Sequence, residues 1–177
     1  MRWLIKDVAL PIAVAVALAL IIQASVAKPY EIPTESMYPT IEANDRIIAN
    51  RLIYRFRDID RGDIVVFEPT RSAQETCEAT VSDVPFVKRV IGLPGDLVEV
   101  RGGRTLVNGT PLVVDKADVP VYTKTFPRVP AGKLLVLGDN RNASCDSHQW
   151  PDPFVPEENV IGQAEFTYWP LSHVKFL

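Results

Sequence analysis

The chain contains 177 residues, of which 19 are basic and 22 acidic, so its formal net charge at pH 7 is −3. This length fits one domain plus an anchor, and without a long run of one sign there is no basic face for a nucleic acid. The two cysteines are too few for a zinc site and no C-x-x-C pair exists, so neither a metal nor an organic cofactor is implied.

The N-terminal part of the chain contains an apolar stretch, Val8–Ala27, of 20 residues without a charged side chain. As a helix rising about 1.5 Å per residue it is about 30 Å long, the thickness of a bilayer core. It therefore predicts a single retained transmembrane helix. A cleaved signal peptide is the alternative, because residues 24–27 resemble a small-residue cleavage site.

The charges before this stretch predict its orientation. Arg2 and Lys6 precede it, so the N-terminus is expected in the cytoplasm or stroma. The remainder is then expected on the periplasmic, extracellular or lumenal side. The predicted division is an N-terminus with its anchor, residues 1–27, and one folded domain, residues 28–177.

The next segment, Ile32–Glu42, places Ser36 between Pro33 and Pro39. Each proline fixes its own φ at about −65° and restricts the residue before it. A serine in such a stiff loop can be presented to a substrate at low entropic cost, as a nucleophile requires. Taken alone, the segment is better explained as a proline-rich linker, and its interpretation depends on the segments that follow.

The remainder of the chain predicts a mostly β fold. Behind the single N-terminal transmembrane helix we expect an antiparallel β-sheet domain with a small β insertion at about residues 96–133. Short apolar runs rich in β-branched residues alternate with turn signals, and Asn108-Gly109 is a strong hairpin signal. The expected strands are residues 46–50, 63–67, 86–91, 97–100, 134–137 and 160–169.

A nucleophilic serine needs a base, and Lys88 is a candidate. Strand alternation puts Phe86, Lys88 and Val90 on one face, so the lysine shares that face with apolar neighbours. Burial disfavours the ammonium and lowers the lysine pKa from about 10.4 toward neutrality, where the amine can accept a proton from Ser36. The alternative is that Lys88 extends from a strand edge with its amine in water.

A third informative segment, residues 138–148, follows the apolar strand 134–137. It brings together Asp, Arg, Ser and His side chains, which can brace an active site through hydrogen bonds. A solvated loop is the alternative.

The two cysteines allow a disulfide. Cys145 lies within residues 138–148, and Cys77 lies in the polar stretch Thr70–Asp83 that connects two expected strands. Both would be on the non-cytoplasmic side, where disulfides persist. Two independent thiols are an equally supported alternative, because pairing cannot be deduced from sequence.

Four segments, in this order along the chain, resemble the conserved boxes of type I signal peptidases. Ile32–Thr40 resembles the nucleophile box, residues 45–67 the next stretch, residues 87–96 the box of the general-base lysine, and residues 138–147 the last box. The resemblance extends from the anchor to Trp169. The Asn after Gly-Asp-Asn-Arg, the His after Asp-Ser and the short insertion place it nearest to the cyanobacterial and thylakoid processing branch.

The resemblance implies a serine–lysine dyad that removes signal peptides from exported proteins. It implies Ser36 as the nucleophile and Lys88 as the base, with the Thr34 hydroxyl and the Ser36 N–H forming the oxyanion hole. In the last box it implies that Ser144 orients the lysine amine and that three charged residues support the site: Asp139, Arg141 and Asp146.

The sequence therefore predicts a membrane-anchored endopeptidase that cleaves N-terminal signal peptides after small residues through an acyl-enzyme. Its partners would be preproteins delivered by the translocation machinery, and membrane lipid. Shallow apolar pockets for alanine-sized side chains are expected at Ile32, Met37, Phe86 and Val87.

Two other functions remain open. The first is a Ser–His–Asp hydrolase that uses Ser36, His148 and an aspartate, because triads are recognised by geometry and not by chain order. The absence of a G-x-S-x-G motif counts against an α/β-hydrolase of this kind. The second is a non-catalytic, membrane-anchored β-domain that binds preproteins, against which the presence of Ser36, Lys88 and Ser144 argues.

Overall fold

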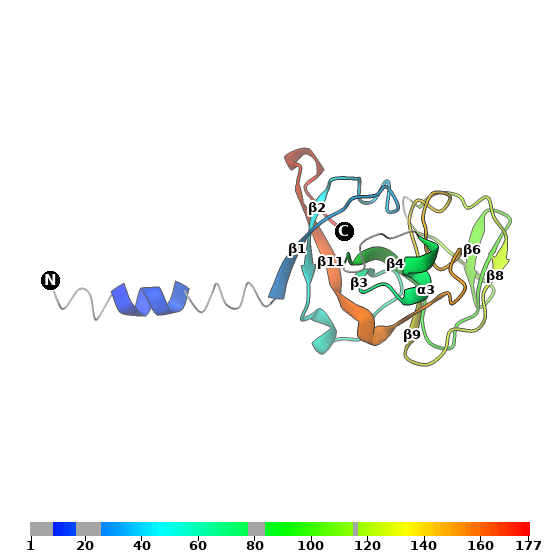
Figure 1. The fold of residues 1–177 in the computed structure, drawn as a ribbon, viewed down its shortest axis with the longest axis horizontal. Helices are drawn as coiled ribbons and strands as arrows, with labels where there is room; N and C mark the ends of the chain where they lie inside the picture. Colours follow the sequence, from blue (N-terminus) through cyan, green and yellow to red (C-terminus); the bar gives the residue numbers. More distant parts are fainter. Residues whose placement is uncertain (1–8, 17–25, 78–83, 115–116) are drawn as a thin grey trace.

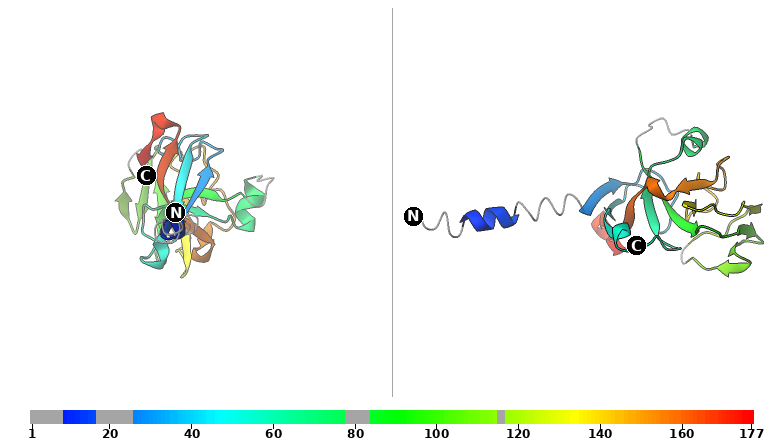
Figure 2. Two further views of the ribbon diagram at one scale, coloured as in Figure 1. Left: turned by 90° about the vertical axis from the view of Figure 1, so that its left-hand side faces the viewer. Right: turned by 90° about the horizontal axis from the view of Figure 1, so that it is seen from below.

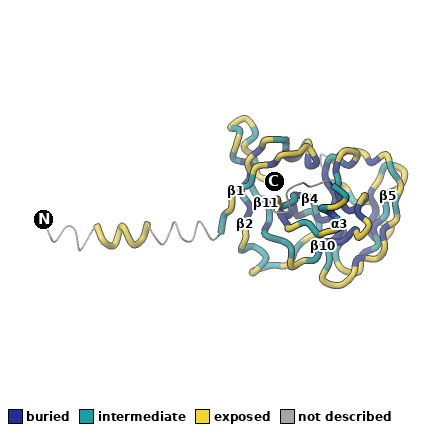
Figure 3. Tube along the Cα trace, viewed as in Figure 1, coloured by how far each residue is buried: buried dark blue, intermediate teal, exposed yellow. Residues whose placement is uncertain are grey.

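The computed structural model describes residues 9–16, 26–77, 84–114 and 117–177. Most of the predicted membrane span, residues 8–27, lies outside these ranges; residues 10–16 are helical with exposed side chains (Figure 3). Of the helices in the described ranges, none has both the length and the apolar character needed to cross a bilayer. Ala27, the last residue of the predicted span, already belongs to a strand.

A main antiparallel sheet confirms the mostly β fold (Figure 1). Its strand order is β1-β2-β11-β3-β4-β9-β10, and β12 pairs with β11. The strands are β1 (Ala27–Glu31), β2 (Arg46–Asn50), β3 (Ile64–Phe67), β4 (Phe86–Gly92), β9 (Lys133–Leu137), β10 (Phe154–Pro156), β11 (Val160–Trp169) and β12 (Lys175–Phe176). The predicted strands 46–50 and 160–169 coincide with β2 and β11.

A second, smaller sheet lies within the range expected for the insertion. Its order is β7-β6-β5-β8, and we call it the small sheet. It consists of β5 (Val98–Arg101), β6 (Arg104–Val107), β7 (Thr110–Leu112) and β8 (Lys124–Thr125). Asn108 and Gly109 have φ of 51° and 80°, as a two-residue hairpin turn between β6 and β7 requires. The small sheet and β1 lie at opposite ends of the domain (Figures 1 and 2).

Short helices occupy several connections. The polar stretch 70–83, expected only as a connection, contains helix α3 (Arg71–Thr76). Thr70 caps this helix, because its Oγ1 accepts the Ala73 N–H at 3.2 Å. The single-turn helices are η2 (Ile53–Arg55), η3 (Glu157–Asn159) and η4 (Leu171–His173).

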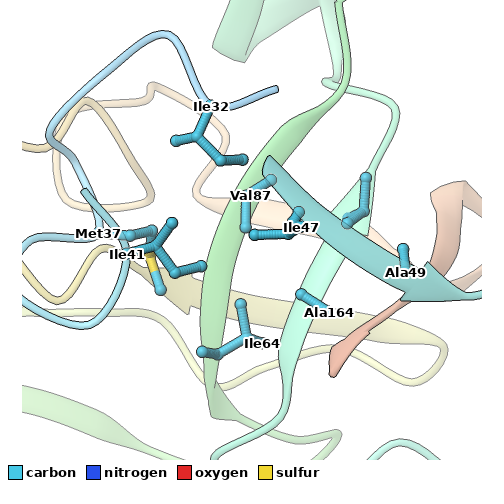
Figure 4. Close-up of a cluster of buried hydrophobic side chains, with 9 residues drawn as sticks. Ile32, Met37, Ile41, Ile47, Ala49, Ile64, Val87 and Ala164 are labelled. Atoms are coloured by element: carbon cyan, nitrogen blue, oxygen red, sulfur yellow. The ribbon is translucent and has the colours of Figure 1, made fainter. Parts of the chain in front are cut away.

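Three clusters of buried apolar side chains form the core. The first lies beside the Ser36 loop, where Met37 and Ile41 pack with Ile47 and Ile64 (Figure 4). A second attaches the small sheet to the main sheet, and its members include Ile91, Val98, Val100, Phe126 and Leu135. A third, on β3, β4 and β9, includes Phe67, Val90, Leu134 and Trp150. The Ser36 loop is thus fixed by the core itself.

Met37 belongs to this core and not to a substrate pocket, contrary to the sequence prediction. Its side chain is fully buried in the first cluster. The residue after Ser36 therefore anchors the loop instead of contacting substrate.

We expect Met37→Ala to lower the free energy of unfolding by about 2–5 kcal/mol, because it leaves a cavity below the Ser36 loop. Activity should fall with it. Met37→Leu conserves volume and should cost less than about 1.5 kcal/mol. Urea denaturation measures both variants. A Met37→Ala variant of unchanged stability and activity would show that the loop has other anchors.

Candidate active site

Ser36 lies in a loop, residues 32–45, whose ends are joined by the backbone. The Ile32 N–H donates to the Asp45 carbonyl at 2.9 Å, and the Asn44 N–H donates to the Ile32 carbonyl at 2.7 Å. Because hydrogen bonds join its two ends and Met37 is buried, the loop holds Ser36 in a fixed position.

Ser36 and Lys88 are in direct contact. The Lys88 Nζ lies 2.8 Å from the Ser36 Oγ and 3.0 Å from the Val87 carbonyl oxygen. Both side chains are buried, since Lys88 is 5% and Ser36 8% exposed. Lys88 pairs with Val65 in the middle of the sheet. The alternative in which the lysine amine reaches water from a strand edge is therefore wrong.

The surroundings of Lys88 favour its neutral form. Burial lowers the pKa of Lys88 to about 8, and the negative charge of Asp146 opposes part of this effect. At pH 8 about half of the molecules therefore carry a neutral amine, which can accept a proton.

Thr34 contacts the same hydroxyl. Its Oγ1 donates to the Ser36 Oγ at 3.2 Å, and the residue itself is exposed. The Thr34 hydroxyl is thus next to the Ser36 hydroxyl, on an exposed residue.

The loop that follows β9, residues 138–148, is joined to the rest of the site by a buried ion pair. Arg89 forms a bidentate pair with the fully buried Asp139, with Nε–Oδ1 of 2.8 Å and Nη2–Oδ2 of 2.5 Å. Arg89 follows Lys88 in β4 and faces the opposite side of the strand. One strand therefore carries the amine on one face and anchors the 138–148 loop with the other.

Asn140 is a functional residue that the sequence analysis did not single out. Its backbone N–H donates to the Ser36 carbonyl at 3.1 Å, and its Nδ2 donates to the Glu35 carbonyl at 3.1 Å. These two bonds fix the backbone that carries the nucleophile. An asparagine in a polar loop gives no local signal that separates this role from simple turn formation.

Arg141 and Asp146 both hold the backbone of Gly138. The Arg141 Nε donates to the Gly138 carbonyl at 3.0 Å, and its Nη1 donates to the Thr105 Oγ1 at 2.5 Å. The Asp146 Oδ2 accepts the Gly138 N–H at 2.8 Å. The start of the loop is thus fixed from both sides.

Ser144, which the resemblance implies to orient the lysine amine, lies beside the Ser36 loop and forms no hydrogen bond to Lys88 within the described ranges. Its side chain is fully buried, and its Oγ has no hydrogen-bond partner among the described residues. The Lys88 amine donates to Ser36 and Val87 instead. A Cβ on Gly138 would clash with both the Ser144 Oγ and the Ser36 carbonyl oxygen, which places the Ser144 hydroxyl beside the nucleophile's backbone.

His148 does not contact the Ser36 hydroxyl. Its Nδ1 lies 2.9 Å from the Asp146 Oδ1, and its ring stacks on Tyr122. The hydrogen bonds of the Ser36 hydroxyl within the described ranges are those to Lys88 and Thr34. This geometry does not support the Ser–His–Asp alternative.

Cys77 and Cys145 are joined by a disulfide, with their Cα atoms 5.8 Å apart. Of the two alternatives open from the sequence, the structure therefore has the bonded one. The bond ties the end of α3 to the 138–148 loop, next to Ser144. The Trp150 indole N–H also donates to the Cys77 sulfur at 3.2 Å.

A cavity of about 540 Å³ opens beside the Ser36–Lys88 pair. Three of the four residues expected in a substrate pocket line it: Ile32, Phe86 and Val87. Both half-cystines and Ala143 also line it. No group of three or more His, Cys, Asp or Glu side chains in the described part of the chain could hold a metal ion.

The chain matches the family described as signal peptidase, peptidase S26, over residues 5–169. It therefore belongs to this family, and it is a serine endopeptidase.

Related proteins specify the branch. Signal peptidase I of Leptolyngbya laminosa is 46% identical over 164 residues, which cover 92% of this chain and 79% of that protein. Thylakoidal processing peptidase 1 of Arabidopsis thaliana is 40% identical over 163 residues, 90% of this chain and 47% of that protein. The predicted nearness to the cyanobacterial and thylakoid branch is confirmed.

A solved structure is also similar. The crystal structure of a signal peptidase I from Enterococcus faecalis is 30% identical to this chain, with a TM-score of 0.48. The match covers 60% of this chain and 97% of that one.

We expect the double variant Cys77→Ser/Cys145→Ser to lose up to about 4 kcal/mol of unfolding free energy, given the enclosed span of 68 residues. Its activity should fall, because the loop next to Ser144 loses one of its attachments. Chemical denaturation and a precursor-cleavage assay measure the two effects. Unchanged stability and unchanged activity together would contradict this role of the disulfide.

Proposed function

We propose that this serine endopeptidase removes signal peptides from exported preproteins with Ser36 as nucleophile and Lys88 as general base. The observation that supports this most strongly is the 2.8 Å contact between two buried side chains, one of them an amine whose pKa burial lowers to about 8. A buried lysine with a depressed pKa next to a serine is the arrangement that nucleophilic catalysis requires.

In the first step the neutral Lys88 amine accepts the Ser36 hydroxyl proton as Oγ attacks the scissile carbonyl carbon. The carbonyl oxygen becomes an oxyanion, which the Thr34 hydroxyl and the Ser36 backbone N–H stabilise. When this intermediate collapses, the C–N bond breaks. The amine of the mature protein takes the proton from the Lys88 ammonium and leaves, and the signal peptide remains as an ester on Ser36.

In the second step the neutral Lys88 amine accepts a proton from water, and the hydroxide so formed attacks the ester carbonyl. The ester bond breaks, Ser36 regains its proton from Lys88, and the signal peptide leaves with a new carboxyl group, which loses its proton to solvent. Lys88 carries the proton in both steps. Ser144, whose buried Oγ has no hydrogen-bond partner among the described residues, is proposed to orient the ammonium that each step creates.

The cavity beside the dyad supports a preference for small side chains before the cleavage site. Ile32, Phe86 and Val87 supply apolar walls close to Lys88, and Cys145 lies within the same lining. Side chains of alanine size would gain apolar contact at these walls.

The apolar residues that precede β1, positions 8–26, are proposed to form a single membrane anchor with the domain on its non-cytoplasmic side. Ser36 follows Ala27 by 9 positions (36 − 27), at most about 30 Å of extended chain, so the site faces the membrane interface. Exposed apolar side chains at the end of β11 and beyond it, Trp169, Leu171 and Phe176, are available to contact lipid. The translocation machinery would deliver the preproteins to this surface.

Ser36→Ala and Lys88→Ala should each reduce precursor cleavage at least about 1000-fold, because each removes a reacting group. His148→Ala should retain measurable activity. The assay is cleavage of an A-x-A-containing precursor by the detergent-solubilised chain, with circular dichroism as the control for folding. A Lys88→Ala variant that still turns over beside an inactive His148→Ala variant would make His148 the base.

The rate constant kcat should rise with pH and level off above an apparent pKa near 8, because only the neutral Lys88 amine can accept the serine proton. The measurement is a pH profile of kcat with a saturating peptide substrate. A profile that already levels off below about pH 6 would contradict a Lys88 base with a pKa near 8.

Protease digestion of sealed, oriented vesicles tests the membrane arrangement. We expect the domain of residues 28–177 to be protected when the vesicle interior is the non-cytoplasmic side, and to be digested once detergent is added. A tag before Arg2 should be cut in intact vesicles. Protection of the tag and the domain together would place them on one side and refute the proposed orientation.

A further inference from the structure

The stretch between β7 and β8 is bonded to the 138–148 loop. The Asp118 N–H donates to the Asp139 carbonyl at 2.8 Å. The Val121 N–H donates to the Asn142 Oδ1, and the Asn142 Nδ2 donates to the Val119 carbonyl, each at 2.9 Å. These bonds fix the first half of the loop against the insertion.

Two side chains of the insertion contact the second half of the loop at His148. The rings of Tyr122 and His148 are stacked, with centroids 4.4 Å apart and planes inclined by 12°. The Lys124 Nζ donates to the His148 carbonyl at 2.5 Å. His148 is thus held by its ring and by its backbone.

His148 in turn fixes Asp146. Its Nδ1 and its backbone N–H lie 2.9 Å and 3.0 Å from the Asp146 Oδ1. The other oxygen, Oδ2, accepts the Gly138 N–H. Asp146 is fully buried, so these bonds decide where its negative charge lies.

The charge of Asp146 acts on four groups around it. Its negative charge raises the pKa of four groups: Lys88 on β4, Lys124 on β8, Arg141 in the loop and the Tyr122 hydroxyl. Lys124 has no carboxylate within 4.0 Å in the described part of the chain, and its Nζ lies over the Phe126 ring, 5.2 Å from the ring centroid. Because this Nζ bonds His148 and His148 bonds Asp146, the positive charge lies near the carboxylate that acts on the base.

We infer that Tyr122 and Lys124 are positioning residues for the dyad: they hold His148 and Asp146 in place, and Lys124 offsets part of the Asp146 charge felt by Lys88. The inference rests on the proposed function, because it concerns the base of that reaction. An insertion remote from Ser36 in sequence thereby helps to set the pH range in which the base is neutral.

Lys124→Met tests the charge. It keeps an unbranched side chain beside Phe126 and removes the positive charge, so the Asp146 charge at Lys88 is less offset, which favours the ammonium. The acid limb of the kcat profile should move up by roughly half a pH unit or more, which lowers kcat about threefold on that limb, with KM unchanged. Lys124→Arg should restore the wild-type profile.

Lys133→Met is the matched control, because Lys133 also lies over a phenylalanine ring, that of Phe154, but pairs with Asp152 outside the site. It should leave the acid limb unmoved. The electrostatic role is overturned if the acid limb of the Lys124→Met profile stays where it is or moves down in pH, in full-length protein with the wild-type melting temperature. It is also overturned if Lys133→Met shifts the acid limb by the same amount.

Tyr122→Leu tests the stacking. It should lower kcat about three- to tenfold with KM within about twofold, because the His148–Asp146 pair loses its support. Tyr122→Phe keeps the stacked ring and removes a hydroxyl without a hydrogen-bond partner in the described ranges, so it should rescue kcat. A Tyr122→Phe variant as slow as Tyr122→Leu, or a Tyr122→Leu variant of wild-type kcat, overturns the positioning role.

These outcomes are separable from failure of the proposed function. If Lys88→Ala retains activity, the dyad itself is wrong and the positioning inference is wrong with it. If Lys88→Ala is inactive while Lys124→Met and Tyr122→Leu keep the wild-type acid limb and kcat, the dyad holds and the inference alone is overturned.

Discussion

The burial of the Lys88 amine is the constraint on which the rest of the structure depends. An ammonium in an apolar interior is unfavourable, and a carboxylate in direct contact would stabilise it and raise its pKa. The amine is bonded instead to the Ser36 hydroxyl and the Val87 carbonyl. Asp146 acts on it without an ion pair among the described residues. The fold thus gives up some stability so that a lysine can be neutral near physiological pH, as active sites commonly do.

Strand β4 connects this amine to the rest of the site. Arg89 leaves the opposite face of the strand and forms the buried pair with Asp139 that anchors the 138–148 loop. Asn140 of the same loop holds the Ser36 carbonyl. The positions of Ser36 and Lys88 are therefore set together by one strand and one loop. The disulfide and the insertion also hold that loop. A substitution in either can therefore shift Ser36 and Lys88 through a short series of contacts.

Much of this was predictable because its signals are local. Alternating β-branched runs and turn residues gave β2 and β11, and apolar neighbours in β4 gave the burial of Lys88. The roles at the site came from the order of four motifs, not from any one residue. The pocket position predicted for Met37 was wrong, because an apolar side chain beside a serine fits the core as well as a pocket. The bonds of Asn140 and the unpartnered Ser144 hydroxyl depend on contacts across the fold, which sequence spacing does not report. Helix α3 and strand β1 are short, so their periodicity is weak.

The most direct test of the account is an NMR titration of the Lys88 side chain in lysine-labelled protein, with its resonance assigned by comparison with Lys88→Arg. The account predicts a midpoint near pH 8. A midpoint at or above about 10.4, the value for a lysine in water, would mean that the amine is charged throughout the working range and cannot be the base.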